Sequence, residues 1–399
     1  MKGYIKFLRD HPKSALFGVV LTFTSSFGQT FLISLYVPSI LEEFELTATA
    51  FGSMYAIATV VASFLLIRFG PGIDRKKVKI FTGRAALLLG VSSLLFALSF
   101  HEASLVLALI GLRFAGQGLM SHISMTVMAR SFTRDRGKAI SVSTLGYSIG
   151  EMIFPALLAF AMGLIGWRWV AGLSVVAVAV IMIPILYKLP LHRFDPEVFE
   201  RKQSSKELGA FFLRQMKLLK FWVLAPTSLA LSFLSTGFFF YQLLLAEDKG
   251  WTIKWYTTAF AAYAISRFVF SLYGGMLTDR FSAIRIFPYH MIPLLFGFVG
   301  IAYFEGDWVA PFYLILTGVT MGSRGTIKNA VFAELYDVDK IGTIRSLFTM
   351  IMVISTATGP MVFGYLLDNG FSFEQIAEVS WMAMAVVIAN SFLIFRFQR

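Results

Sequence analysis

The sequence contains one short element twice, as Gly70-Pro-Gly-Ile-Asp74-Arg75 and as Gly275-Met-Leu-Thr-Asp279-Arg280. Both copies follow the pattern Gly-x-x-x-Asp-Arg, and each comes after a long apolar stretch. The second copy lies about half a chain length after the first, which predicts two related halves. In each copy the glycine allows helices to approach closely, and the Asp-Arg pair can form an ionic contact at a helix end.

The amino-acid composition indicates the class of protein in which this repeat occurs. The 399-residue chain is 57% hydrophobic and 15% charged, and it has no cysteine. Soluble domains contain about 25% charged residues, so this composition excludes a soluble enzyme, a disulfide scaffold and a disordered tail. The formal charge of +12 does not indicate nucleic acid as a partner, because Lys and Arg are diluted by 42 Phe and 17 Met instead of forming one basic face. We expect a polytopic protein of the lipid bilayer.

The apolar stretches are long enough to cross a membrane, since a transmembrane helix needs about 20 mostly apolar residues. We predict an all-α membrane protein with twelve transmembrane helices in two pseudo-symmetric six-helix bundles. The expected spans lie at about 15–37, 49–69, 79–100, 103–130, 139–163, 168–188, 219–246, 254–277, 285–304, 308–335, 344–367 and 376–396. The longest polar connection divides the chain into an N-terminal bundle at 1–188, a linker at 189–218 and a C-terminal bundle at 219–399.

The distribution of charge predicts the orientation. Most of the 35 Lys and Arg residues lie in the termini, the linker and alternate loops, whereas the opposite loops contain Arg168, Lys249 and Lys254. Positively charged loops remain in the cytoplasm. Both termini and the linker are therefore expected to be cytoplasmic, in a multi-pass protein of the inner (cytoplasmic) membrane.

A further motif in the fourth span, Arg113-Phe-Ala-Gly116-Gln-Gly118, is similar to the Arg-x-x-x-Gly-x-Gly pattern of a known family. With the repeated Gly-x-x-x-Asp-Arg element, the chain resembles the major facilitator superfamily over its full length. The loop from Arg130 to Arg136 and the glycines of span 5 look like those of bacterial members near the monocarboxylate-transporter and oxalate/formate-antiporter branch. Span 5 lacks the Gly-Pro-x-x-Gly-Gly element of drug/proton antiporters, and span 1 lacks the acidic-Gly-Gly-Trp element of animal monocarboxylate carriers. The resemblance implies alternating access to a site between two halves.

Five charged residues lie inside the predicted spans: Arg113, Glu151, Arg267, Arg324 and Lys328. A charge near the bilayer centre costs about 2.5–3.5 kcal/mol, so each needs a partner or an aqueous cavity. Four of the five are cationic, which favours an anionic substrate.

Arg267 and Arg324 are the candidate ligands of that anion, because a guanidinium donates two parallel hydrogen bonds to a carboxylate. In the carboxylate-carrier branch, span 8 bears an Arg that looks like the carboxylate-binding group. Here Ser271 occupies that position and Arg267 lies one turn deeper, with Tyr263 one turn above it on the same face. The alternatives are a pairing or helix-packing role for Arg267, and for Lys328 a position at the membrane interface.

Arg113 and Glu151 are expected at similar depth on neighbouring helices. The simplest interpretation is a buried ion pair. The functional alternative makes Glu151 the proton-coupling site with Arg113 beside it, because burial favours a neutral carboxyl and a nearby Arg favours its charged form.

The first helix of each half is expected to line the cavity of this fold. Gln29, Tyr36, Tyr241 and Gln242 are the candidate lining residues, and interhelical hydrogen bonding is the alternative. The expected cytoplasmic gate consists of Gly70, Asp74, Arg75, Gly275, Asp279 and Arg280.

The sequence has no metal-ligand cluster, phosphate-binding loop or nucleophile motif. We therefore expect no cofactor, no metal and no enzymatic activity. The function we predict is secondary active transport of a small organic anion, expected to be a carboxylate, by a monomer with the proton as candidate coupling ion in symport. The alternative is export of a larger amphipathic compound such as a drug, siderophore or lipid, which a Met-rich interior would suit.

Overall fold

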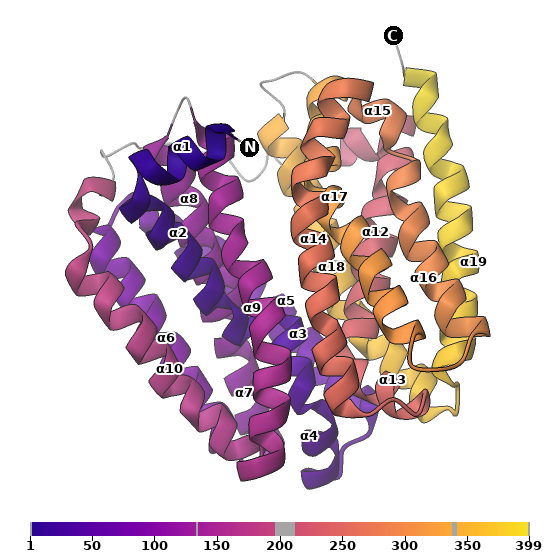
Figure 1. Cartoon of the computed structure of the whole chain (residues 1–399), viewed down its shortest axis with the longest axis horizontal. Helices are drawn as coiled ribbons and strands as arrows, with labels where there is room; N and C mark the ends of the chain where they lie inside the picture. Colours follow the sequence, from indigo (N-terminus) through magenta and orange to yellow (C-terminus); the bar gives the residue numbers. More distant parts are fainter. Residues whose placement is uncertain (1, 133–134, 196–211, 337–340, 398–399) are drawn as a thin grey trace. The chain divides into compact units, whose positions relative to one another are not determined.

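A computed structural model describes residues 2–132, 135–195, 212–336 and 341–397, and in these ranges the regular structure is entirely helical (Figure 1). The chain divides into two compact units. The first unit comprises Met1–Leu46 and Met54–Glu200, and the second comprises Thr47–Ser53 and Arg201–Arg399. Much of the linker expected at 189–218 lies outside the described residues, so the domain boundaries remain a prediction.

The first unit is built from the two parts of a broken helix followed by five long helices. Its elements are α1 (Lys2–Asp10), α2 (Pro12–Thr24), η1 (Ser25–Gly28), α3 (Thr30–Ile33), η2 (Ser34–Tyr36), α4 (Val37–Glu43), α5 (Ala48–Phe69), η3 (Gly70–Asp74), α6 (Val78–Ala97), α7 (Glu102–Leu112), η4 (Arg113–Met120), α8 (Ser121–Ser131), α9 (Arg136–Ile165), α10 (Trp167–Lys188) and η5 (Leu191–Phe194). The beginning of α5 belongs to the second unit.

The second unit has a similar order of long helices along the chain. Its remaining elements are α12 (Leu219–Phe240), α13 (Gln242–Asp248), α14 (Ile253–Phe281), α15 (Ala283–Ile286), η6 (Tyr289–Met291), α16 (Ile292–Tyr303), α17 (Val309–Leu335), α18 (Ile341–Asp368), α19 (Phe373–Ser391) and η8 (Phe392–Phe397). Within this unit α14 packs along α17, α12 along α18 and α16 along α19 (Figure 1).

These helices account for the predicted membrane spans. Nine helices of the described residues are long and apolar enough to cross a membrane, and the bent pair Pro12–Gly28 and Thr30–Glu43 would make a tenth. The two other predicted spans coincide with the shorter apolar helix around α16 and with the 27-residue α17. The all-α membrane fold predicted from the sequence is confirmed.

The first span is broken in its middle. Its two parts differ in direction by 43°, and Gln29 at the junction has an extended backbone (φ −83°, ψ 151°). The break lies against span 4, where Gly28 and Gly116 touch so closely that a Cβ on Gly116 would approach Gly28 Cα to 2.7 Å. Span 4 itself widens there into the π-helix η4, a form frequently found at functional sites.

The most extensive helix contact in the second unit joins α14 and α17. Gly318 and Gly322 of α17 lie against the α14 backbone, and a Cβ on Gly322 would come within 2.3 Å of the Arg267 carbonyl oxygen. Small residues allow backbones to approach in this way inside a membrane. The contact brings the two helices that carry Arg267 and Arg324 together.

Candidate functional site

Arg267 on α14 and Arg324 on α17 lie within electrostatic range of each other across this glycine-lined contact. Both side chains are partly exposed. Nη1 of Arg267 donates a hydrogen bond to the Tyr263 hydroxyl at 3.3 Å, and its guanidinium carbon lies 5.9 Å from the centre of the Tyr263 ring. The predicted shared face of Tyr263 and Arg267 is confirmed.

Arg324 forms its hydrogen bonds with α12. Its Nη2 donates to the Ser232 hydroxyl at 2.5 Å and to the Ser228 carbonyl oxygen at 3.4 Å. Among the described residues, the two oxygens that accept hydrogen bonds from Arg324 are uncharged. The hydrogen bonds therefore position the guanidinium without neutralising its charge.

Two further cations extend this positive region. Lys328 lies one turn after Arg324 on α17, and the charges of Arg324 and of Arg345 on α18 both act on it. We call Arg267, Arg324, Lys328 and Arg345 the cationic cluster. Like charges gathered in a low-dielectric interior repel one another, so an anion that entered the cluster would relieve that repulsion as well as accept hydrogen bonds.

Arg113 of the first unit has a different environment. It is 3% exposed, and it donates to the Thr59 hydroxyl at 3.2 Å and to the Gly28 carbonyl oxygen at 3.2 Å. A longer hydrogen bond reaches Thr30 at 3.4 Å, and the guanidinium carbon lies 4.8 Å from the centre of the Tyr55 ring. Arg113 thus satisfies a carbonyl that the helix break at Gly28 leaves without its usual partner.

The ion pair between Arg113 and Glu151 expected from the sequence is not among the described contacts of Arg113, which are with hydroxyl, carbonyl and aromatic groups. Glu151 on α9 is buried, at 5% exposure. The residue before it, Gly150, packs against Ser26 of η1. Similar depth on two helices does not determine the partners of Arg113, whose side chain is directed toward α5 and the helix break.

A family model supports the resemblance seen in the sequence. The model described as Major Facilitator Superfamily matches residues 18–310 and 228–399. The chain belongs to the major facilitator superfamily. Membership of this superfamily indicates a membrane transporter.

A curated relative of this major facilitator protein is the aspyridones efflux protein apdF of Emericella nidulans. The two are 26% identical over 337 residues, which make up 80% of this chain. The match spans 64% of the relative's length.

Solved structures with the same fold include other transporters. The nucleoside transporter NupG has a TM-score of 0.74 at 14% identity, with 96% of this chain and 98% of that chain covered. A bacterial homolog of the human lysosomal transporter Spinster, inward-facing and unoccupied, has a TM-score of 0.64 at 15% identity, with 97% and 96% covered. At these identities the likeness shows the major facilitator fold alone.

The other predicted lining residues differ in accessibility. Gln29 is partly exposed at the break of the first span, and its amide donates to Ser25 at 3.5 Å. Tyr36 is buried in an aromatic group with Phe96 and Trp167. Of the two residues from the first unit, Gln29 is therefore the one placed where a solute could reach it.

Tyr241 and Gln242 lie at the junction of α12 and α13, where the first helix of the second half is interrupted. Both are fully buried, at 0% exposure. The Tyr241 hydroxyl donates to the carbonyl oxygens of Ala48, at 2.7 Å, and of Pro360, at 3.0 Å. These hydrogen bonds join the junction to α5 and α18, and the lining role of both residues stays a prediction.

The first Gly-x-x-x-Asp-Arg element forms an ionic contact whose partner the sequence did not identify. Asp74 pairs with Arg130 at the end of α8, at 3.0 Å, and Arg130 also donates to the Phe194 carbonyl oxygen at 2.8 Å. Arg75 is exposed, and Gly70 packs beside the His122 ring. The neighbouring helix start at Val78 is capped by another residue, Asp195.

The second element is described less completely. Gly275 and Arg280 lie in the last turns of α14, and the side chain of Asp279 lies outside the described residues. Glu334 at the end of α17 accepts hydrogen bonds from Ser282 and from the backbone of Ala283 at the start of α15. The carboxylate of Glu334 thus stabilises a helix start, as Asp195 does in the first unit.

Several residues of this major facilitator protein were not assigned from sequence. Tyr55 and Thr59 on α5 both contact Arg113. Their separation of four residues within an apolar span indicates that they share one face of the helix. Arg345, at the start of α18, also belongs to the cationic cluster.

Proposed function

We propose that this major facilitator protein transports a small organic anion, with a carboxylate bound by Arg267 and Arg324, by secondary active transport. The observation that supports the proposal most directly is the Arg324 guanidinium, held in the second unit by neutral oxygens of Ser232 and Ser228 beside a second arginine. Such a group retains both its charge and the capacity to bind a carboxylate in a bidentate manner. The sequence likeness to the monocarboxylate and oxalate/formate branch points to the same substrate class.

The test is uptake by the purified full-length chain in proteoliposomes. A panel of radiolabelled mono- and dicarboxylates is offered under an imposed pH gradient to wild type, Arg267→Ala and Arg324→Gln. Loss of a charge-assisted hydrogen bond costs about 1.5–3 kcal/mol, so either variant should raise the half-saturating concentration about 10- to 100-fold.

Arg285→Gln is the matched control, because Arg285 is an exposed arginine of α15 outside the cationic cluster. It should transport as wild type does. Absence of any carboxylate uptake that depends on Arg267 and Arg324 would overturn the proposal.

Glu151 is the proposed proton carrier. It is a buried carboxyl on α9, and the hydrogen bonds of Arg113 to Gly28, Thr30 and Thr59 give that arginine a structural role that does not require Glu151. Burial favours the neutral form of a carboxyl, and a change in its surroundings during the transport cycle can release the proton.

Glu151→Gln tests this role, since glutamine preserves the shape and cannot release a proton. Accumulation driven by a pH gradient should be lost, whereas exchange of internal for external substrate should continue. Loss of both activities would instead show a structural role.

Export of a larger amphipathic compound is the second candidate, favoured by the relative named as an aspyridones efflux protein. Because the distribution of Lys and Arg predicts which side of the protein faces the cytoplasm, import can be distinguished from export. Transport of amphipathic compounds that continues in Arg324→Gln, together with no carboxylate uptake, would favour this candidate.

A further inference from the structure

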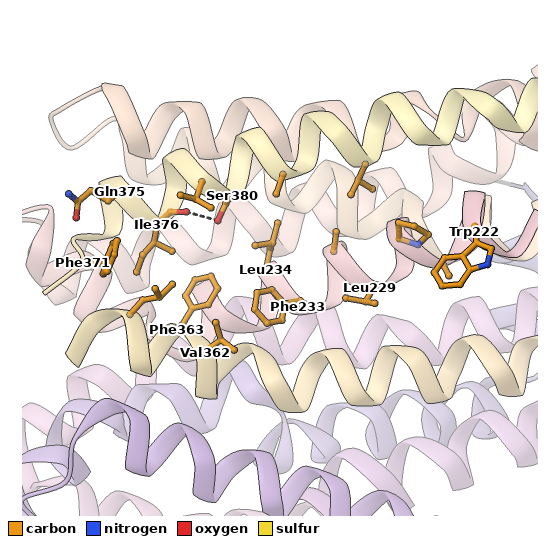
Figure 2. Close-up of a pocket in the computed structure, with 17 residues that line it drawn as sticks. Trp222, Leu229, Phe233, Leu234, Val362, Phe363, Phe371, Gln375, Ile376 and Ser380 are labelled. Carbon is orange, nitrogen blue, oxygen red and sulfur yellow. Dashed lines mark hydrogen bonds between the residues drawn. The ribbon is translucent and has the colours of Figure 1, made fainter. Parts of the chain in front are cut away.

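The second unit has an apolar groove on its outer surface that is separate from the cationic cluster. It is formed by α12, α18 and α19, and its volume is about 490 Å³, within the range of ligand sites. Figure 2 shows side chains such as Leu229, Phe233, Val362, Phe363 and Ile376 along its walls. The groove is open to the surroundings, because Leu229 is 48% and Val379 is 64% exposed.

The polar side chains in the groove already have partners within the protein. The Ser380 hydroxyl donates to the Ile376 carbonyl oxygen, shown dashed in Figure 2, and the Gln375 amide oxygen accepts from the Ser372 backbone. The Trp222 indole donates to the Met216 carbonyl oxygen at 2.8 Å. A ligand with polar groups would find little here to orient it, so the groove suits a hydrocarbon chain.

The length of the groove matches such a chain. From Trp222 to Leu234 along α12 the distance is about 18 Å at 1.5 Å per residue, slightly more than one leaflet of a hydrocarbon core about 30 Å thick. Gln375 to Val387 on the antiparallel α19 covers the same length. The groove therefore runs along the helices, parallel to the chains of a bilayer lipid.

One end of the groove is cationic. The hydrogen bond from Trp222 to Met216 fixes the preceding segment beside this end, and that segment carries the exposed side chains of Arg214 and Lys217. Tryptophan is enriched at membrane interfaces. The distribution of Lys and Arg predicts this end to be cytoplasmic, where the leaflet contains anionic lipids.

We propose that the groove binds one acyl chain of an anionic phospholipid, whose headgroup lies at Arg214 and Lys217. An anionic lipid satisfies both features at once: an apolar channel whose polar side chains are already bonded within the protein, and a cationic end at the interface.

The experiment uses the purified full-length protein in nanodiscs that contain photoreactive phosphatidylglycerol, with a diazirine on one acyl chain, or the matching phosphatidylcholine. Cross-linked peptides are mapped by mass spectrometry. We expect labelling of α12 and α19 to be stronger with phosphatidylglycerol, by about fivefold for each cation at the headgroup. The double variant Arg214→Gln/Lys217→Gln should remove that preference.

Filling the groove provides the second arm. Ala383→Phe and Ala230→Phe place a ring among the lining residues, and each should reduce the labelling to the level of other lipid-facing helices. Val386→Phe is the matched control, because Val386 is on α19 and 69% exposed but does not line the groove. Equal labelling by the two lipids, or equal labelling of Ala230→Phe and Val386→Phe, would show an ordinary lipid-facing surface and overturn the proposal.

Discussion

Each of the two units has an arginine inside a membrane span, and the burial and the partners of the two arginines differ. Arg113 in the first unit is almost fully buried and bonded to Gly28, Thr30 and Thr59. Arg324 in the second unit is partly exposed and lies beside another cation, Arg267. An arginine that donates hydrogen bonds to the backbone of a broken helix stabilises the fold. An arginine that is positioned yet electrostatically repelled is suited to bind an anion.

The largest expected effect is a difference in the free energy of unfolding between variants of these two arginines. Arg113→Leu removes hydrogen bonds from a charged donor and leaves the Gly28 carbonyl oxygen unpaired, which should cost about 3–5 kcal/mol in the free energy of unfolding. Arg324→Gln should change that free energy by less than about 1 kcal/mol, because loss of the repulsion from Arg267 offsets the lost hydrogen bonds. Thermal unfolding of the purified proteins in one detergent measures both.

A conservative change sharpens this comparison. Arg113→Lys keeps the charge but cannot reproduce the planar fork or its contact with the Tyr55 ring. It should therefore also unfold at a lower temperature than wild type. Equal stability of Arg113→Leu and Arg324→Gln would show that the two environments do not differ in the way described.

A smaller effect is expected from the serine that positions Arg324. Ser232→Ala removes one of the hydrogen bonds of Arg324, together with the bond of Ser232 to the Ser228 carbonyl oxygen within α12. The half-saturating concentration for the transported anion should therefore rise about fivefold, the equivalent of about 1 kcal/mol. Ser235→Ala is the control, because the Ser235 hydroxyl donates within its own helix to Leu231. Uptake kinetics in proteoliposomes distinguish them, and equal constants for both variants would remove the positioning role of Ser232.

The smallest effect concerns the ionic contact of the first unit. The Asp74–Arg130 pair is partly exposed, and exposed pairs contribute less than about 1 kcal/mol. Asp74→Asn should therefore leave stability and substrate binding nearly unchanged but lower the maximal rate, if the pair breaks during each transport cycle. Asp135→Asn disrupts the exposed pair with Lys138 nearby and should not lower the rate. An unchanged rate in Asp74→Asn would exclude the gate.

The sequence was sufficient for features that depend on spacing along one helix. Twelve apolar stretches predicted the helices, and a separation of four residues placed Tyr263 beside Arg267. The glycine pattern also indicated close contacts, although the tightest contact with α14 involves Gly322 instead of Gly275. Each of these inferences uses the fixed rise and rotation of an α-helix.

Features that depend on how helices rotate against one another could not be predicted. The partners of Arg113 are on α5 and at the break of the first span, and no spacing within span 4 shows that its side chain turns toward them. The break itself depends on packing of Gly28 against Gly116 from another helix. For the same reason the sequence did not show that Tyr36 is enclosed by Phe96 and Trp167.

The π-helix η4 gives span 4 an unusual tolerance of its own length. Its hydrogen bonds join residues five apart instead of four, so this stretch holds an extra residue compared with a regular helix. Deleting one residue here would return the stretch to a continuous α-helix and leave α8 close to its present rotation relative to α7, because the wider turn already absorbs the extra residue. Ser124, which donates to the Gly18 carbonyl oxygen at 2.9 Å, would then still face the first span. The wider turn therefore lets this span hold one more residue while both of its ends keep their neighbours in the first unit.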